Sequence, residues 1–472
     1  MRTHIRFCLV ALILFLGIIF LYPKNVSAAG QIVPEVKIFE NGVQTKSFYG
    51  FDLGFRGGVR VATGDVDGNG ADEIIVAAGV NGGPNIQIFK NNGEKMISFM
   101  AYDIKFRNGV KVTSCDVNND GRDEIITSPG LRGGPNVKIF NVGGEQLRSF
   151  MAYDINFRGG VNIGCGDVNA DGLAEIITGA GPGGGPHVRV FNQKGESLNM
   201  DFFPFSFNNK GGVNIAVGNV TGDERPEIIV SVAQFGVPVI EVYDDQWHKL
   251  SGFYAYDVEF QGGVNIATGN IDNDNYDEII AAANTGAGPH VRTLDYLGNN
   301  QELNFFPYPV DFRGGVFVAS GDVIGDGKDE IITGPGFLAD TRYSQYPKYI
   351  DIDISEQKLK VIENGQEIGD YQISSGKPGM DTPGGIFTVL SKSPTAYSKK
   401  YALYMPYWMQ FSGQGHGLHG LPYWRLRGGG VIKEGENHLG IRVSHGCVRL
   451  SWEDAEIVYN WVSIGTPIII HN

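Results

Sequence analysis

Short apolar runs separated by turns rich in glycine, aspartate and asparagine fill residues 34–337, with no helical period anywhere. One such run, at residues 124–127, follows an acidic loop and precedes a Gly-Pro turn. Another, at residues 137–140, follows that turn. Similar segments recur every 51 or 52 residues along the chain. Four short strands per unit of about 50 residues are typical of propeller blades.

The two ends of this repeat array are incomplete in complementary ways. Residues 36–58 match only the second half of a unit, and residues 316–337 match only the first half. Joining the halves gives one composite blade and removes the exposed edge strands that an open sheet would leave. We therefore expect an all-β, six-bladed propeller over residues 33–337, with an open β-solenoid as the alternative.

Each unit contains an acidic loop after its first strand. In the first loop, oxygen-bearing side chains stand at positions 1, 3, 5 and 9, and Gly70 allows the sharp turn. Alternate oxygen ligands around a tight turn suit a hard cation such as calcium. Four loops have such a set: Asp65, Asp67, Asn69 and Glu73; Asp116, Asn118, Asp120 and Glu124; Asp167, Asn169, Asp171 and Glu175; Asn270, Asp272, Asp274 and Glu278.

These loops resemble the FG-GAP repeats of integrin-type propellers, a resemblance that implies structural Ca²⁺ and no catalytic metal. The fourth loop, which begins at Asn219, contains Pro226, and the sixth has Ile324 at a ligand position. We therefore do not expect these two loops to bind calcium well. The alternative for all six is that Asp and Asn side chains only accept turn hydrogen bonds from the backbone.

A polar linker at residues 338–347 separates the repeats from a second domain at residues 348–472. Residues 349–354 alternate apolar and polar side chains as a half-buried strand does. Residues 357–362 continue as a second strand, and Asn364-Gly365 predicts a hairpin turn. Ser451 is placed to cap a helix over residues 452–462. The second domain is thus expected to be mainly β with one or more short helices.

The heptapeptide Ser444-His445-Gly446-Cys447-Val448-Arg449-Leu450 carries the candidate chemistry of this domain. A cysteine acts as a nucleophile when imidazole or cationic neighbours help it to lose its proton. Together with the Leu418-His419-Gly420 motif, this string resembles the L,D-transpeptidase (YkuD-like) catalytic domain.

That resemblance implies a role for each matching residue. Cys447 is the nucleophile, His419 is the general base, and the carbonyl of Gly420 orients the imidazole. Arg449 meets a substrate carboxylate or holds the site together. An oxyanion hole would be formed by backbone amides around His445, Gly446 and Cys447, with Ser444 beside them.

The 27 residues between His419 and Cys447 are about twice as many as in many members of that family. His438 and His416 are therefore alternatives for the base. The insertion, residues 421–443, is interpreted either as a lid over the substrate or as a loop packed on the surface.

The function that the resemblance implies is peptidoglycan cross-linking in cell wall biogenesis. Cys447 would attack a tetrapeptide stem and release the terminal D-Ala, and an amine of a second stem would then form a 3-3 cross-link. If water replaces the amine, the enzyme is an L,D-carboxypeptidase. A non-enzymatic envelope-binding or adhesion protein is the third interpretation. The ligand of the propeller is not predicted.

Residues 1–28 have the features of a secretory signal peptide. Arg2 and Arg6 precede an apolar run at residues 7–22, and small residues at 26–28 offer a cleavage site. We expect export to the cell wall, the periplasm or the outside, with an uncleaved membrane anchor as the alternative.

The net charge of -14 lies entirely in the first 347 residues, which hold 40 acidic and 26 basic residues. A nucleic-acid partner is therefore not expected. Cys115 and Cys165 lie on equivalent strands of neighbouring repeats but differ in register by one residue. Since such an offset turns side chains to opposite faces, we expect no disulfide between them and interpret both as small buried residues.

Overall fold

The computed structural model describes residues 33–471 except 81, 224, 235, 337–347, 364–365 and 427. The expected signal peptide, the linker and the Asn364-Gly365 turn lie outside the described residues. Within the described part, strands dominate, and α1 (Trp452–Trp461) is the one α-helix. The all-β class is thus confirmed. No helix among these residues is both long and apolar enough to cross a membrane.

The repeat region, residues 33–336, contains six four-stranded antiparallel sheets. Five of them each use four consecutive strands, and the sixth combines both ends of the region. The five sheets are β3 (Val59–Gly64), β4 (Glu73–Ala78), β5 (Asn85–Phe89) and β6 (Lys95–Met100); β7 (Val110–Cys115), β8 (Glu124–Pro129), β9 (Asn136–Phe140) and β10 (Gln146–Met151); β11 (Val161–Gly166), β12 (Glu175–Ala180), β13 (Val188–Phe191) and β14 (Ser197–Phe202); β15 (Val213–Gly218), β16 (Glu227–Val232), β17 (Val239–Tyr243) and β18 (Lys249–Tyr254); β19 (Val264–Gly269), β20 (Glu278–Ala283), β21 (Val291–Leu294) and β22 (Asn300–Phe305).

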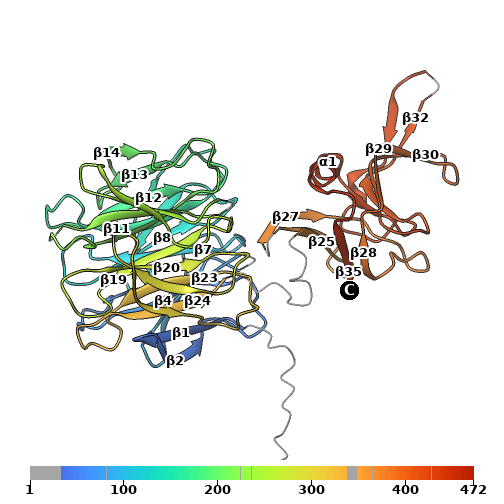
Figure 1. Cartoon of the computed structure of the whole chain (residues 1–472). Helices are drawn as coiled ribbons and strands as arrows, with labels where there is room; N and C mark the ends of the chain where they lie inside the picture. The colour runs from blue at the N-terminus through green and yellow to red at the C-terminus, as the bar shows by residue number, and fades with distance from the viewer. Residues whose placement is uncertain are drawn as a thin grey trace, which may run out of the picture. The chain divides into compact units, whose positions relative to one another are not determined.

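The sixth sheet has the order β2-β1-β24-β23. Its strands are β1 (Glu35–Glu40), β2 (Val43–Tyr49), β23 (Val316–Gly321) and β24 (Glu330–Pro335). Lys37 pairs with Thr333 across the antiparallel contact between β1 and β24 (Figure 1). The pairing of the two ends of the repeat array, which the sequence predicts, is therefore present.

Burial within each sheet follows the strand order. All six residues of β4 are buried, as are all six of β8, β12, β16, β20 and β24. A strand covered on both faces is expected to be a continuous apolar run rather than an alternating one. The outermost strand β10 instead alternates exposed and half-buried residues. This gradient explains why the second strand is the most apolar part of each repeat.

The first strands of the sheets contact one another in the order β3, β7, β11, β15, β19 and β23, and β23 also contacts β3. The fifth residue of the first strand points toward the preceding sheet. Ser114 Oγ thus donates to Thr63 O, and Thr268 Oγ1 donates to Val217 O at 2.7 Å. Side chains on one face of a first strand therefore meet the backbone of the neighbouring sheet.

The C-terminal domain, residues 348–471, contains two further sheets. The first has the order β27-β26-β25-β35-β28, with β25 and β35 parallel. The second has the order β33-β32-β30-β31-β34, and β29 also pairs with β30. The strands are β25 (Lys348–Asp353), β26 (Lys358–Glu363), β27 (Gln366–Gln372), β28 (Gly385–Thr388), β29 (Ser391–Ser398), β30 (Leu403–Gln410), β31 (Gly417–Gly420), β32 (Tyr423–Arg425), β33 (Val431–Lys433), β34 (Val448–Leu450) and β35 (Pro467–His471).

One hydrophobic core joins both of these sheets to α1. It includes Ile352 and Ile468 from the first sheet, Leu418 and Val448 from the second, and Val458 from the helix, all with no exposed surface. The helix begins as predicted, because Ser451 Oγ accepts the Asp454 amide at 3.0 Å. The core thus fixes β31 and β34, which carry His419 and the residues just after Cys447, against the rest of the domain.

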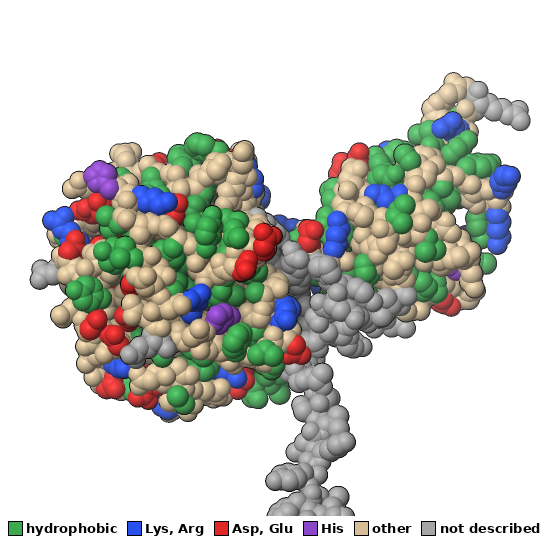
Figure 2. Space-filling view, in the orientation of Figure 1, with side chains coloured by type: hydrophobic (Ala, Val, Ile, Leu, Met, Phe, Trp, Pro, Cys, Tyr) green, Lys and Arg blue, Asp and Glu red, His purple; other side chains and the backbone are tan. Residues whose placement is uncertain are grey.

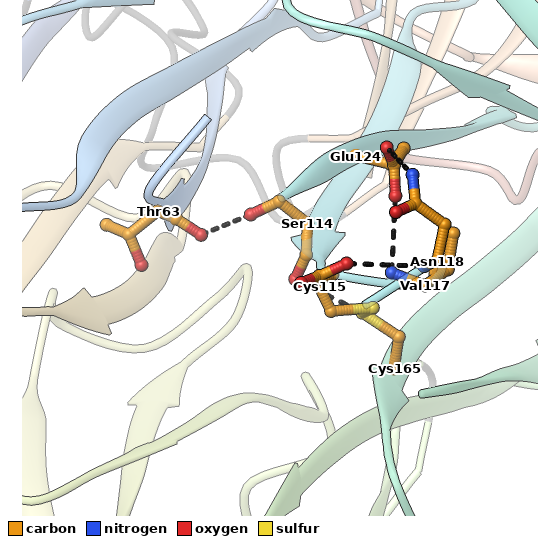
Figure 3. The surroundings of a disulfide bond; sticks show 8 residues. Thr63, Ser114, Cys115, Val117, Asn118, Glu124 and Cys165 are labelled. Carbon is orange, nitrogen blue, oxygen red and sulfur yellow. Dashed lines mark hydrogen bonds between the residues drawn. A yellow bond between two sulfur atoms is a disulfide. The ribbon is translucent and has the colours of Figure 1, made fainter. Parts of the chain in front are cut away.

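The expectation for Cys115 and Cys165 is wrong, because the two form a disulfide with their Cα atoms 6.3 Å apart (Figure 3). Cys165 is the fifth residue of β11 and points back to the preceding sheet, where its Sγ lies 3.1 Å from Ser114 O. Cys115 is the sixth residue of β7. The equivalent sixth residue of β3 is Gly64, where a Cβ would point toward Ser114 of the following sheet. A side chain at the sixth position thus faces the following sheet, whereas one at the fifth position faces the preceding sheet. The offset of one residue therefore turns the two cysteines toward each other, since their strands belong to sheets that pack face to face.

Removing this disulfide should destabilise the repeat region. The bond closes a loop of 50 residues, for which loop entropy alone predicts a contribution of about 4 kcal/mol. We expect Cys165→Ser to lower the free energy of unfolding by ~2–4 kcal/mol in a denaturant titration. Cys447→Ser, which removes the described cysteine outside the disulfide, is the matched control and should change the free energy of unfolding little. Equal unfolding midpoints for Cys165→Ser and the wild type would contradict the stabilising role.

Candidate active site

The parallel pairing of β31 with β34 brings the candidate catalytic residues together. His419 pairs with Arg449, and Leu418 pairs with Val448. Leu418 and Val448 are fully buried in the core. Because successive side chains of a strand point to opposite faces, His419 and Arg449 lie on the other face. Cys447 directly precedes β34 and stands two residues before Arg449, so continued alternation predicts the same face for its side chain.

His419 is held in one tautomer by its neighbour. It is only 2% exposed, and its Nδ1 lies 2.7 Å from Gly420 O. Since a carbonyl oxygen only accepts hydrogen bonds, Nδ1 carries the proton and Nε2 is left as a proton acceptor. The predicted orienting role of the Gly420 carbonyl thus agrees with this contact. The Trp408 ring packs beside the imidazole at 5.7 Å between centroids.

Burial keeps both partners neutral. The pKa of His419 is lowered to about 3, mainly by burial and also by the charge of Arg449, against the opposing effect of the hydrogen bond to the Gly420 carbonyl. Burial also raises the pKa of the Cys447 thiol above its usual value, although the Gly417 backbone and Arg449 act in the other direction. The half-buried cysteine is therefore a thiol at neutral pH, and its reaction requires a base.

Ser444 organises the turn that presents the cysteine. Its Oγ accepts the Gly446 amide at 3.1 Å and donates to Cys447 O at 2.5 Å. Gly446 has a φ of 103°, and a Cβ there would lie 2.8 Å from the His416 ring. The glycine is therefore required for conformation and for space. The Gly446 amide already binds Ser444, so an oxyanion hole that uses it would have to share that donor.

Arg449 has a carboxylate partner that sequence reasoning did not single out. The guanidinium is 7% exposed, and its Nη1 lies 3.1 and 3.0 Å from the two carboxylate oxygens of Glu434. Glu434 belongs to the 421–443 insertion, and its carboxylate also lies 3.1 Å from His438 Nδ1. The insertion thus neutralises the arginine beside His419. In the sequence, Glu434 is marked only as an acidic residue between the His419 motif and the cysteine heptapeptide.

The other two histidines near the site have different partners. His416 Nδ1 lies 2.9 Å from Ser412 Oγ, and the ring stacks on Phe411. His445 is exposed and packs on Tyr401 with ring centroids 4.7 Å apart. His419 is the histidine that lies opposite Arg449 in the strand pairing, and its role as the base stays a prediction.

Residues 374–381 also hold the cysteine segment. The Ser374 and Arg449 backbones exchange two hydrogen bonds of 2.9 and 3.0 Å, and the Ser444 amide donates to Ser375 O. Arg442 pairs with Asp381 at 2.5 Å and donates to Gly376 O. These contacts join segments that are far apart in the sequence, so no local pattern predicts them.

The 421–443 insertion forms a hairpin rather than an irregular loop. β32 pairs with β33 and with β30, through Tyr423 and Tyr404. Figure 1 shows this hairpin reaching away from the rest of the C-terminal domain. Trp424 and Ile432 on it are 38% and 54% exposed. The base of the hairpin packs on the domain, since Tyr423 is buried and Lys433 lies over the Trp452 ring. Both interpretations of the insertion, a lid and a surface-packed segment, stay predictions.

Two of the four predicted cation loops bring three carboxylates together. The oxygens of Asp65, Asp67 and Glu73 lie within 4.8 Å of one another, and so do those of Asp272, Asp274 and Glu278. The alternative turn bonds are also present, since Asp65 accepts the amides of residues 68, 69 and 70. The turn hydrogen bonds and the predicted cation ligands therefore belong to the same loop.

In the second and third loops, an asparagine amide contacts the buried glutamate. Asn118 Nδ2 donates to Glu124 at 2.7 Å, as Figure 3 shows, and Asn169 Nδ2 donates to Glu175 at 2.9 Å. Here a cation would have to displace the amide nitrogen. The first and fifth loops are thus the best candidates for metal binding. Figure 2 shows acidic side chains in several separate groups on the visible face of the repeat region.

Buried carboxylates in the loops favour a cation chemically. Burial and neighbouring aspartates raise the pKa of Glu73 and of Glu278 to about 7. Glu73 is 3% exposed, and its Oε2 has no hydrogen-bond partner among the described residues. A carboxylate in this state gains a partner and loses repulsion when a divalent cation binds. The residues therefore fit the predicted ion.

Comparison with known proteins concerns the C-terminal domain. Residues 347–470 match the family model of the L,D-transpeptidase catalytic domain, YkuD. "Probable L,D-transpeptidase 3" of Mycobacterium tuberculosis is 31% identical over 166 residues, covering 31% of this chain and 58% of that protein. YciB of Bacillus subtilis, whose name also refers to an L,D-transpeptidase, is 32% identical over 127 residues, covering 26% and 64%.

Among solved structures, an L,D-transpeptidase (Yku) from Stackebrandtia nassauensis matches 27% of this chain and 57% of that chain, with 28% identity and a TM-score of 0.23. The chain spans about three fifths of the length of the relatives that it matches. Both curated relatives carry an L,D-transpeptidase name. Residues 347–470 of this chain are therefore similar to the L,D-transpeptidase catalytic domain, YkuD.

Proposed function

We propose that the chain is an exported peptidoglycan L,D-transpeptidase that forms 3-3 cross-links through a Cys447 acyl-enzyme. The observation that carries the proposal is the pairing of β31 with β34, which sets His419 opposite Arg449, two residues after Cys447. The family match of residues 347–470 supports the same chemistry. The substrates are the stem peptides of two neighbouring peptidoglycan strands, one as acyl donor and one as acceptor.

The first half-reaction transfers the acyl group to the enzyme. His419 Nε2 takes the thiol proton, and Sγ attacks the carbonyl that joins the third stem residue to the terminal D-Ala. The C–N bond breaks, the proton moves from His419 to the departing amine, and D-Ala leaves. In the free enzyme, His419 and Cys447 are both neutral. The mechanism requires no thiolate in that state, because the thiol proton moves to His419 only when substrate is in place.

The second half-reaction releases the product. A side-chain amine of the acceptor stem attacks the thioester, His419 takes the amine proton, and Cys447 recovers it as the thiol. Backbone amides of the cysteine turn would stabilise the oxyanion in both steps. The Glu434 carboxylate balances the charge of Arg449, so the site carries one less uncompensated cation beside the imidazole. Attack by water instead would make the same site an L,D-carboxypeptidase.

Acylation is the step that tests this proposal. Incubation with a disaccharide-tetrapeptide should add the donor mass, less D-Ala, to the wild type in intact-mass spectrometry. Cys447→Ser should give no thioester, and His419→Gln should acylate about 10²–10⁴ times more slowly, because the base is lost. His471→Gln is the matched control, since that histidine pairs with Asp351 in the other sheet.

The products decide between the two reactions. Cross-linked dimer supports the transpeptidase, whereas tripeptide alone would contradict it and favour the carboxypeptidase. No adduct on the wild type would contradict both. If His438→Gln abolished acylation while His419→Gln retained it, His419 would not be the base.

We also propose that the six repeat sheets form a closed six-bladed propeller whose first and fifth loops bind Ca²⁺ as a structural ion. Support for closure comes from the pairing of β1 with β24 and from the contact between β23 and β3. Support for calcium comes from the two sets of three carboxylates. The ion would neutralise the buried glutamates and cross-link the loop ends, with no part in acyl transfer.

Calcium should stabilise the intact protein more at pH 8 than at pH 5. The pKa of Glu73 is raised from 4.5 to about 7 in the folded state, so the ion-free fold loses stability as pH rises through this range. Calcium reverses that loss only where the carboxylates are ionised. At about 100 times Kd, one site adds about 2.7 kcal/mol, which a thermal melt would record as a higher Tm.

The paired variant Asp67→Asn with Asp272→Asn removes one carboxylate from each site and should abolish most of the calcium shift. Asp326→Asn, in the sixth loop with Ile324 at a ligand position, is the matched control and should keep it. A Tm that does not respond to calcium at pH 8 would contradict the metal assignment and leave the loops as hydrogen-bonded turns.

A further inference from the structure

A cavity in the repeat region is lined by residues of all six sheets. Its polar lining comes largely from one structural position, the second residue of each first strand. These residues are Arg60, Lys111, Asn162, Asn214, Asn265 and Phe317. The repeats agree closely elsewhere, but at this position they offer two cations, three amides and one aromatic ring. The layer is therefore asymmetric and chemically distinct from the rest of the array.

The three asparagines are fixed by the backbone of the following sheet. Asn162 Nδ2 donates to Val213 O at 2.6 Å. The equivalent bonds from Asn214 and Asn265 are both 2.7 Å long. Each amide thus donates one hydrogen bond to the backbone, and Asn214 Nδ2 also lies 3.3 Å from Asn265 Oδ1. Asn162 is 3% exposed, and its Oδ1 has no hydrogen-bond partner among the described residues. A buried acceptor in this state favours a ligand that brings an N–H or O–H.

The two cations lie on neighbouring first strands. The Arg60 guanidinium stacks over the Phe317 ring at 5.3 Å and donates to Val110 O at 3.3 Å, while its buried Nε has no partner within the described chain. Across the described residues, no carboxylate forms an ion pair with Arg60 or Lys111. Burial and the charge of Arg60 lower the pKa of Lys111 to about 7. Two adjacent half-buried cations that form no ion pair with a described carboxylate of the repeat region favour an anionic ligand.

We propose that this cavity binds the carboxylate of a small ligand or chain end that carries an adjacent N–H, as the C-terminus of a peptide does. The carboxylate would lie between Arg60 and Lys111, and the N–H would donate to Asn162 Oδ1. The third residue of each first strand, a Val or Ile in every sheet, lines the same cavity and suits a short aliphatic side chain. A phosphate fits less well, because its oxygens would face the free oxygen of Asn162.

This inference does not depend on the proposed transpeptidase activity. Its test uses the full chain and ligand-observed NMR titrations with N-acetyl-D-alanine, which has both groups. N-acetyl-D-alaninamide, which lacks the charge, is the control ligand. The wild type should bind the acid at least tenfold more tightly than the amide. Lys111→Met should weaken binding of the acid at least tenfold. The matched control Lys105→Met, an exposed lysine just before the same strand, should stay within twofold.

A second variant guards against a folding defect in Lys111→Met. Asn162→Asp is nearly isosteric and places a carboxylate on the strand next to Lys111. It should therefore also weaken the binding of N-acetyl-D-alanine at least tenfold. Unchanged affinity in both variants would overturn the proposal, because binding would belong to another site. No binding to the wild type would overturn it as well. Inorganic phosphate that bound more tightly than N-acetyl-D-alanine would overturn the carboxylate assignment.

Discussion

The candidate active site depends on one constraint, the parallel register of β31 with β34. That register sets His419 opposite Arg449, and continued alternation from Arg449 predicts Cys447 on the same face. A shift of one residue would turn the imidazole into the core that Leu418 and Val448 now fill. The buried apolar face thus holds the polar face in position, and the chemistry rests on the packing beneath it.

The same burial decides the protonation states. It keeps His419 and Cys447 neutral, and it makes an unpaired Arg449 costly, so Glu434 supplies the counterion. Because Glu434 comes from the 421–443 insertion, the extra length of this segment contributes directly to the site. In the repeat region, by contrast, burial leaves Glu73 Oε2 and Arg60 Nε without a hydrogen-bond partner among the described residues, and we propose a bound ion and a ligand near these atoms.

Sequence reasoning reached the all-β class, the pairing between the ends of the repeat region and the capped helix, because each depends on a local pattern or on the repeat itself. It also named Cys447, His419 and Gly420 as candidate site residues, and the contact between His419 and the Gly420 carbonyl is present. It failed for Cys115 and Cys165, which form a disulfide. A one-residue offset turns side chains to opposite faces within one sheet, but opposite faces of two sheets that pack face to face point toward each other. The Glu434 contact and the Ser374 contact with Arg449 join distant segments, so no spacing in the sequence reveals them.

The most direct test of the account is an NMR titration of the histidines in ¹⁵N-labelled intact protein. The account predicts that His419 remains neutral from about pH 8 to about pH 4, with the proton on Nδ1, because burial lowers its pKa from 6.5 to about 3. Its Nε2 is then ready to accept the thiol proton of Cys447 throughout that range. A His419 that titrates near its usual pKa, or that carries its proton on Nε2, would contradict the account.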